Sequence, residues 1–405
     1  MRQTVQSERS IKNFLPFYSA RKNIPHPNIH FNDGPVVENP GDGQPIKVRF
    51  MLGDHCEYET QLGPGEWAKA DKKFAAVWKI EISDCDGAHL YNHIFDTAQK
   101  KVRINIDSRS LGDTLAWIPQ IEAYKKAHRD TKVFVCHFWP TLGFESEYPE
   151  LYFIDPGQQL DDCYATYNLG FYFNEILTCH PRDPRTVPLG MVASDILGIA
   201  YKESRPKIKH VAGKRGISAP YVCIATASTA NCKHWLYEGG WQFVVDQLSE
   251  MGFSVVVIQK ESTTLKNVID QTGDAPIQDR IDMLRHCEFF IGLGSGLSWL
   301  AWAVERPVVM ISGFSAPFAE FQDRCYRVSN DKVCTACWND TAYRFDRDDW
   351  NWCPRHADTG RQFECSRLIT PTQVMTQVVR LLTERREKPV LERRISCRKH
   401  PLRRS

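Results

Sequence analysis

From residue 101 onward, short apolar runs alternate with amphipathic runs, and this alternation constrains the fold more than any other feature. The run VRINID at 102–107 predicts a strand, and it is followed by apolar residues at helical spacing, namely Leu111, Leu115, Ile118 and Ile121. Further strands are predicted at 132–138, 150–155 and 164–173, and a helix at 188–199. Such βαβ repetition predicts a parallel sheet between helices, and we assign this Rossmann-like half to 101–215.

A second series follows a basic, glycine- and proline-containing connector. Strands are predicted at 221–228, 254–260, 288–296 and 307–314, with helices between them and a closing helix at 370–387 capped by Thr370 or Thr372. We assign the second Rossmann-like half to 216–330 and 366–388. Two doubly wound halves in tandem predict an α/β protein with its ligand in the cleft between the carboxyl ends of the strands.

The flanking regions have a different character. Residues 1–27 are polar and predict a flexible arm, whereas 28–100 contain alternating β-rich runs between Gly, Pro and Asp and predict a small antiparallel β-barrel domain. Residues 389–405 form a basic tail: from 385 to 405 there are nine Lys/Arg and two Glu. Such a tail is typical of a solvated terminus, and an electrostatic docking arm is the alternative.

Overall charge and hydropathy narrow the functional class. The net charge of +2 gives no global field toward nucleic acid or membrane, so neither is expected as a partner. No apolar run approaches the roughly 18–20 residues of a membrane span, and the first residues lack the apolar core of a signal peptide. A cytoplasmic location is therefore expected.

Four of the 14 cysteines are clustered with metal-ligand spacing. Two thiols three residues apart can bind one ion, and a second pair on a returning segment completes a tetrahedron. The segment 331–365 is thus predicted to be a metal finger inserted into the second half, structural because no coordination position stays open, with zinc and iron both possible. Its ligands would be Cys334, Cys337, Cys353 and Cys365, with His356 as a substitute or supporting donor; chance clustering and a redox pair are the alternatives.

Two turns carry the candidate anion-binding groups. The glycines of IGLGSGLSW (291–299) lie where a strand meets a helix, so free backbone N–H groups can face a phosphate. Lys233, a few residues beyond another strand, could neutralise a diphosphate or be an ordinary surface lysine. Phe314 could lie beside a base or ribose in the same cleft.

Asp113 poses the central question of the first half, because an acid at a helix start can cap the helix or complement its dipole. As a catalytic base it would be expected to stay ionised near the helix N-terminus. Gly112 has no side chain, so the backbone of a molecule whose proton Asp113 accepts could come close to the acid.

The motifs SLGDTLAWIPQIEAY (110–124) and FFIGLGSGLSWLAWAVERPVVMISGF (289–314) resemble the ADP-heptose glycosyltransferases, which have the GT-B fold. YATYNLGFYF, YVCIATASTANCKHW and WCPRHADTGRQFECSRLIT narrow the resemblance to the bacterial autotransporter heptosyltransferases. The matched motifs span roughly 101–370, and the cysteine finger is their most discriminating part.

The resemblance implies a donor, ADP-D-glycero-β-D-manno-heptose, and acceptor Ser/Thr hydroxyls on the passenger domain of an autotransporter adhesin. It also implies one iron ion (Fe³⁺) held by the four cysteines, and a homododecameric ring built from the finger and a hairpin thumb, for which 200–217 and 259–278 are candidates. Asp113 would be the general base and Lys233 the catalytic cation, with phosphates held by the amides of 294–298 and the Ser298 hydroxyl. The residues assigned to the donor are Gly112, Thr114, Thr226, Ser228, Thr229, Lys233, Gly294, Ser295, Gly296, Leu297, Ser298, Trp299, Gly313 and Phe314.

No catalytic Mg²⁺ is expected, because the helix terminus and the lysine would take its place. The acidic runs QQLDD and RDD are interpreted as solvated loops. A heptosyltransferase of lipopolysaccharide core synthesis and a non-enzymatic metal-finger binding protein are the competing hypotheses. Loss of a finger cysteine, as in Cys337→Ser, is expected to damage the oligomer more than the donor site.

Overall fold

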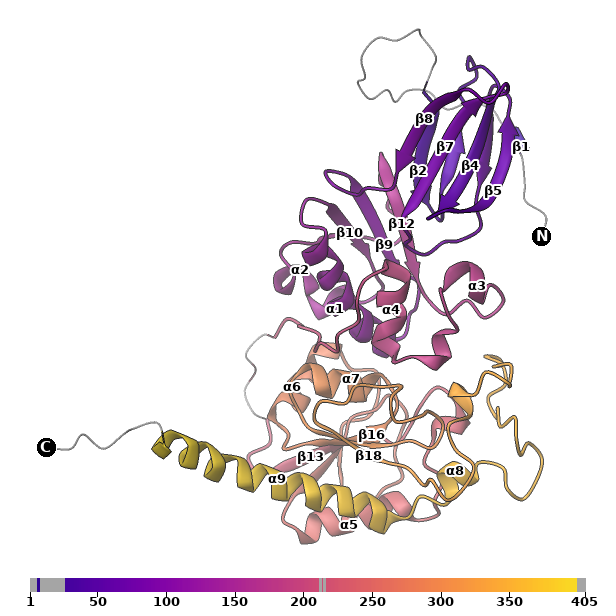
Figure 1. Ribbon diagram of the computed structural model, residues 1–405. Coiled ribbons are helices and arrows are strands. Elements are labelled where there is room, and N and C mark those ends of the chain that lie inside the picture. The colour runs from indigo at the N-terminus through magenta and orange to yellow at the C-terminus, as the bar shows by residue number, and fades with distance from the viewer. Residues whose placement is uncertain (1–5, 8–25, 211–212, 214–215, 399–405) are drawn as a thin grey trace, which may run out of the picture.

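The computed structural model of the protein describes residues 6–7, 26–210, 213 and 216–398, and its two α/β halves are stacked with a β-rich unit at the far end of the first (Figure 1). The GT-B-like arrangement of two α/β halves is confirmed. The predicted arm at 1–27 falls almost entirely outside the described residues. Its described part includes a two-residue strand, β1 (Gln6–Ser7), which pairs with β6.

The first half is built on an eight-stranded sheet in the order β1-β6-β3-β2-β12-β9-β10-β11. Its other strands are β2 (Asn28–Asn32), β3 (Val36–Glu38), β6 (Glu66–Lys69), β9 (Lys101–Ile106), β10 (Lys132–Cys136), β11 (Tyr152–Ile154) and β12 (Cys163–Leu169). The segment from β2 through β12, β9 and β10 to β11 is parallel, with Val102 opposite Val133 on one side and Ala165 on the other. All three are fully buried, as expected for parallel strands covered on both faces.

The β-rich unit at 28–100 is antiparallel, as predicted, but its strands are divided between two sheets. β4 (Ile46–Leu52), β5 (His55–Leu62), β7 (Trp78–Asp84) and β8 (His89–Ile94) form a separate sheet in the order β5-β4-β7-β8. β2, β3 and β6 instead extend the sheet of the first half. The prediction of a closed barrel is therefore wrong for the described strands, since the four-stranded sheet ends at β5 and β8.

The second half contains a six-stranded parallel sheet in the order β15-β14-β13-β16-β17-β18. Its strands are β13 (Tyr221–Ile224), β14 (Ser254–Val257), β15 (Ile269–Asp270), β16 (Phe290–Leu293), β17 (Val308–Ile311) and β18 (Cys325–Val328). β15 lies inside 259–278 and pairs parallel with β14, so it does not form an antiparallel hairpin there. The other thumb candidate, 200–217, includes residues outside the described set.

Helices cover both sheets. They are α1 (Leu111–Ala127), α2 (Phe144–Glu147), α3 (Ile176–Cys179), α4 (Leu189–Leu197), α5 (Gly240–Glu250), α6 (Ile277–His286), α7 (Gly296–Ala303), α8 (Glu364–Arg367) and α9 (Pro371–Arg398), with three-ten turns at Pro140–Leu142, Pro184–Thr186, Asn231–Lys233 and Cys337–Asn339. α5 and α9 bury Val244, Leu248, Val374 and Val378 in one apolar cluster with the second sheet. α1, α4, α6 and α7 belong to a larger cluster that continues from one half into the other. The contact between α1 and α7 therefore joins the halves at the cleft.

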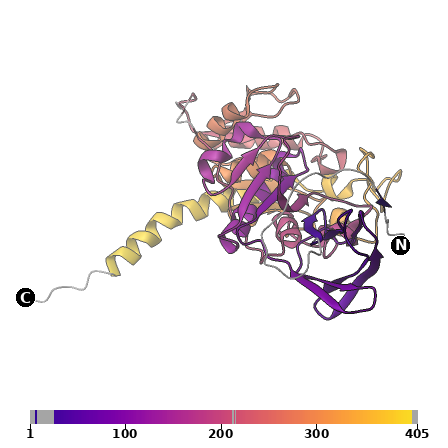
Figure 2. The same ribbon diagram turned by 90° about the horizontal axis from the view of Figure 1, so that it is seen from above.

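The C-terminal end differs from the prediction. Thr370 caps α9 by accepting a hydrogen bond from the Gln373 amide, and the helix continues to Arg398, away from the rest of the molecule (Figures 1 and 2). The first ten residues of the predicted tail at 389–405 are thus helical, and 399–405 lie outside the described residues. Among the described helices, none combines the length and apolar character of a membrane span.

Candidate active site and metal-binding segment

The turn that ends β9 answers the question about Asp113. Ser110 is the N-cap of α1, and its hydroxyl accepts the Asp113 amide proton at 3.5 Å. The Asp113 carboxylate does not cap the helix. Its Oδ2 instead accepts a 2.5 Å hydrogen bond from the Ser108 hydroxyl. The capping function therefore belongs to Ser110, and Ser108 is a supporting residue that the sequence interpretation missed.

Burial and four neighbouring side chains set the pKa of this carboxyl group. Burial raises the pKa of Asp113, and it outweighs the opposing effects of the hydrogen bonds of Ser108 and Ser110 and of the positive charges on Lys233 and Arg347. The expectation that Asp113 stays ionised near the helix N-terminus remains a prediction, and burial acts against it. A carboxyl group with a raised pKa is a stronger base once it is deprotonated.

Gly112 lies where the two halves touch. A Cβ atom on Gly112 would approach Trp299 Cδ1 to 3.2 Å, and one on Gly296 would approach Leu111 Cβ to 3.0 Å. The space beside Gly112 is thus filled by α7. We had expected this space to admit an acceptor backbone, and that prediction is wrong. Trp299 is itself buried and packs edge-on against Trp302 and Phe321.

The glycine turn after β16 presents backbone amides to the cleft. Ser295 is the N-cap of α7, so the amides of Gly296 and Leu297 occupy the first helical positions, where no intrahelical acceptor exists. The Ser298 hydroxyl is fully buried and donates to the Leu293 carbonyl at 2.6 Å, so it faces the turn and not the cleft. Gly294 is needed for space, because a Cβ there would lie 2.8 Å from Glu320 Oε1.

Glu320 belongs to a polar cluster beneath the glycine turn that the sequence did not reveal. Arg327 Nη1 contacts Glu320 Oε2 at 2.6 Å, and both side chains are only 11% exposed. Ser315 donates to the other carboxylate oxygen at 2.7 Å. This cluster holds the loop after β17 against the glycine turn.

The loop after β13 is organised by a side chain from the loop that follows β14. Gln259 Oε1 accepts from the amides of Thr226 and Ala227 and from the Thr226 hydroxyl. Ser228 Oγ is buried without a hydrogen-bond partner among the described residues, and Thr229 is exposed. Ser228 thus has a buried hydroxyl whose hydrogen-bonding capacity is unused among the described residues. Thr114, in contrast, is fully buried and donates to the Ser110 carbonyl in its own helix.

Lys233 and Phe314 meet at the cleft, with Lys233 Nζ 5.7 Å from the centroid of the Phe314 ring. The loop that carries Lys233 is held on both sides by residues 331–366, which comprise the predicted finger and Ser366 and are called the cysteine segment below. On one side, the Asn231 amide donates to the Trp350 carbonyl at 3.0 Å. On the other side, the Ser366 hydroxyl donates to the His234 carbonyl and accepts from the Leu236 amide.

The four predicted ligands lie in one segment and their thiols interact electrostatically, but among the described residues the four sulfur atoms do not form a group within 4.8 Å of one another. Cys334 and Cys337 have sulfur atoms 3.9 Å apart, close to the edge of a tetrahedron of thiolates around a metal ion. Burial raises the pKa of Cys337 and of Cys365 to about 12, and the neighbouring thiols of Cys334 and Cys353 add to the shift. Buried thiols gathered in this way are costly to ionise unless a cation joins them. Cys232, interpreted from sequence as an ordinary cysteine, is buried in the same cluster.

Gly313 explains how the segment approaches the second sheet. A Cβ atom on Gly313 would overlap the carbonyl group of Cys365, and the Gly313 carbonyl accepts hydrogen bonds from the Thr335 hydroxyl and the Ala336 amide. Gly313 therefore anchors the cysteine segment.

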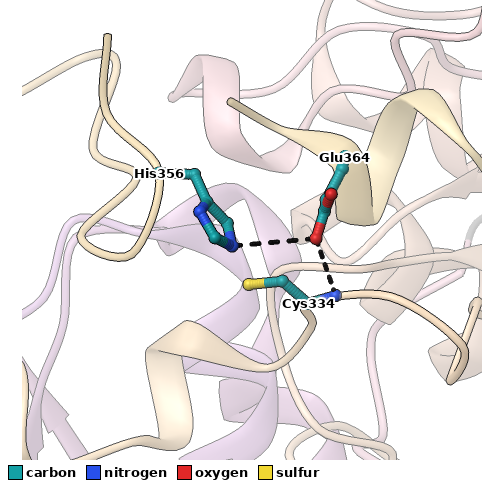
Figure 3. A group of neighbouring side chains, drawn as sticks. All are labelled: Cys334, His356 and Glu364. Carbon is teal, nitrogen blue, oxygen red and sulfur yellow. Dashed lines mark hydrogen bonds and ion pairs between the residues drawn. The ribbon is translucent and has the colours of Figure 1, made fainter. Parts of the chain in front are cut away.

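A second group of possible ligands lies beside the cysteines (Figure 3). Cys334, His356 and Glu364 bring one ligand atom each within 4.8 Å of one another. Both oxygens of Glu364 are engaged by Arg361, one of them also accepts the Cys334 amide, and the Arg361 hydrogen bond lowers the pKa of Glu364 to about 2. His356 Nε2 lies 3.7 Å from the same carboxylate. These contacts fit a supporting function for His356 and Glu364, which would orient Cys334, better than they fit direct binding of a metal by the two residues.

Comparison with known proteins decides the family. The chain is 37% identical to the autotransporter heptosyltransferase BAHTCr of Citrobacter rodentium, over 87% of this chain and 88% of that protein. The chain belongs to the autotransporter heptosyltransferase family. Residues 194–342 match the model of glycosyltransferase family 9 (heptosyltransferase), so this chain is a glycosyltransferase of the heptosyltransferase class.

A solved structure supports the same assignment. TibC from enterotoxigenic Escherichia coli, described as an iron-containing dodecameric glycosyltransferase, superposes with a TM-score of 0.82 at 34% identity, covering 89% of this chain and 96% of that one. TibC has also been solved in complex with ADP-D-β-D-heptose. One relative, from Burkholderia thailandensis, is described as an inactive autotransporter heptosyltransferase and is 35% identical over 89% of this chain and 86% of its own length.

Proposed function

We propose that the protein is a protein O-heptosyltransferase, which transfers heptose from ADP-D-glycero-β-D-manno-heptose to Ser/Thr hydroxyls of an autotransporter adhesin passenger domain. One observation carries the proposal: the start of α1, which bears Asp113 on the first half, meets the start of α7 on the second half at Gly112 and Gly296. The positive charge of Lys233, on the second half, acts to lower the pKa of Asp113. A candidate base and a candidate leaving-group cation thus face each other across the cleft. The ADP-heptose complex of TibC supports the choice of donor.

The reaction is a direct displacement at the anomeric carbon. Asp113 accepts the proton of the acceptor hydroxyl, whose oxygen forms the new bond to the anomeric carbon. The bond from that carbon to the diphosphate oxygen breaks, and its electron pair leaves with ADP. General base catalysis contributes about 10²–10⁴-fold to such a step. Attack in line with the leaving group gives inversion at the anomeric carbon.

Charge on the departing ADP is stabilised from the second half. Lys233 supplies a cation, and the free amides of Gly296 and Leu297 supply hydrogen bonds at the positive end of α7. The unpartnered Ser228 hydroxyl is a further donor. With these groups in place, the scheme assigns no role to Mg²⁺.

The finger is proposed to hold one iron ion through Cys334, Cys337, Cys353 and Cys365, with zinc as the alternative. The 3.9 Å separation of two sulfurs and the burial of the cluster fit this assignment, and TibC is described as iron-containing. With four protein ligands the ion has a structural function. Elemental analysis and an Fe–thiolate absorption band would distinguish iron from zinc.

The partners and location follow from the family. A homododecameric ring is proposed because TibC is described as dodecameric. Transfer is proposed to occur in the bacterial cytoplasm, on the passenger before its export.

The test combines the protein with ADP-heptose and an autotransporter passenger and measures the intact mass of the passenger. Heptose additions are expected with the wild type and are expected to disappear in a folded Asp113→Ala variant. Absence of transfer to any passenger would contradict the proposal and would favour an inactive member of the family. Transfer to lipopolysaccharide core in place of passenger would support the competing enzyme hypothesis.

A further inference from the structure

A cavity of about 790 Å³ opens between the first half and the cysteine segment. One wall is the stretch 171–175, which follows β12, and the other is 344–348. The sequence had predicted that the first stretch would continue the strand, but β12 ends at Leu169. The residues after it are thereby free to form a wall at the carboxyl edge of the sheet.

Specific contacts tie the two walls together. Arg344 Nη2 donates to Asn174 Oδ1 at 3.1 Å, and the rings of Phe173 and Phe345 lie 5.5 Å apart. The Arg347 guanidinium lies 5.9 Å from the centroid of the Phe173 ring. The cavity is thus a joint product of the two segments.

The cavity borders the turn that carries Asp113. Tyr172, in its wall, donates a 2.5 Å hydrogen bond to Asp107, and the next residue, Ser108, donates to the Asp113 carboxylate. Arg347, from the opposite wall, acts electrostatically on Asp113. The cavity wall is thus connected to the Asp113 turn through Tyr172 and Asp107.

The charges of the lining argue against a second nucleotide. Glu175 is paired with Lys73, which lies outside the lining. The remaining carboxylates, Asp346 and Asp348, balance the guanidinium groups of Arg344 and Arg347, so the lining has no excess positive charge to favour a diphosphate. Aromatic rings beside mixed polar groups suit an uncharged, hydroxyl-bearing chain. The three acids and Asn174 are exposed, so the cavity can be entered from solvent by part of a large molecule.

We propose that this cavity binds the acceptor: an extended, Ser/Thr-bearing segment of the passenger polypeptide lies between 171–175 and 344–348 with its hydroxyl directed at Asp113. The proposal rests on the proposed function and adds a second purpose for the cysteine segment, which would form part of the acceptor site. The heptose of the donor is the competing occupant.

The test fills the cavity at its rim with Asn174→Trp in the full-length protein. ADP affinity and the slow hydrolysis of ADP-heptose by water report on the donor site, and heptose addition to the passenger reports on the acceptor. We expect the KM for the passenger to rise by about tenfold or more, while donor hydrolysis stays within about twofold of the wild type. Melting temperature confirms that the variant is folded.

A matched control fills another hollow at the same edge of the sheet. Glu145→Trp adds the same side chain at an exposed position in the cavity of about 370 Å³ beside β10 and β11, and we expect it to leave passenger transfer unchanged. An unchanged passenger KM in Asn174→Trp would overturn the proposal, as would equal loss of hydrolysis and transfer, which would assign the cavity to the heptose. A wild type that hydrolyses the donor but modifies no passenger would instead count against the proposed function.

Discussion

A Cβ atom on Gly296 would lie 3.4 Å from the backbone nitrogen of Gly112, so the two halves meet backbone to backbone at the starts of α7 and α1. This approach places the base-bearing helix of the first half beside the anion-facing turn of the second. The relative position of Asp113 and the free amides of α7 is therefore fixed by packing of the glycines as well as by the connector between the halves.

Gly296→Ala should separate these helix starts. The added methyl group meets Leu111 Cβ at 3.0 Å, and overpacking of this kind typically costs about 1–3 kcal/mol of unfolding free energy. We expect a lower melting temperature together with weaker ADP binding. Gly41→Ala is the control, because a Cβ atom there meets no heavy atom within 4 Å. Equal behaviour of the two variants would show that the glycine contact does not position the halves.

Ser108→Ala should change the pH dependence of transfer. The reaction needs Asp113 deprotonated, so the rate rises as the pH passes upward through the pKa of this group. Ser108 donates to the charged carboxylate and lowers its pKa, so removal of the hydroxyl raises that pKa further. The acidic limb of the kcat profile should move to higher pH. A limb that stays in place, or moves to lower pH, would exclude this function for Ser108.

Lys233→Met should reduce kcat by about 10²–10³-fold, because the departing diphosphate loses its cation. The Lys233 Nζ lies 5.7 Å from the centroid of the Phe314 ring, and methionine keeps a side chain of similar length beside it. Isothermal titration with ADP should show weaker binding in the same variant. Lys47→Met is the control: this lysine pairs with Glu59 in the β-rich unit. A small, equal effect of both substitutions would leave Lys233 as an ordinary surface lysine.

Cys337→Ser should release the metal and also damage the donor site. The sequence suggested damage mainly to the oligomer. In the structure, however, the Trp350 carbonyl accepts from the Asn231 amide and the Ser366 hydroxyl donates to the His234 carbonyl, which connects the two sites. We expect metal content to fall, ADP affinity to weaken and the assembly to shrink on size-exclusion chromatography. Cys85→Ser, at an exposed position, should change none of these. Metal loss with intact ADP binding would show that the loop does not depend on the finger.

The sequence predicted well those features that depend on local pattern. We could predict the alternation of strands and helices, the glycine turn before α7 and the cysteine spacing. Each of these depends on hydrophobic period and residue type within one segment. The Asp113 turn was located correctly as well. Its cap was not, because Ser110 and Asp113 both have side chains suited to a helix start.

Features that depend on pairing between distant segments were missed. Nothing near β2 indicates that it joins β12, so a barrel was predicted where the strands separate into two sheets. Gln259 was overlooked because its amide serves a loop more than thirty residues earlier. The helical continuation of α9 was hidden by a proline and by the basic composition of 389–405, which is typical of a free tail.

The contacts between the cysteine segment and the loop of Lys233 have a consequence for the life of the protein in the cell. With a metal bound by the cysteines, as proposed, a newly synthesised chain acquires its leaving-group chemistry only when the segment closes on the metal. Before that stage the enzyme would not hydrolyse its sugar-nucleotide donor. The amount of active enzyme would then depend on the supply of the metal. Starvation for the metal should leave the adhesin unmodified while the amount of the enzyme polypeptide stays normal.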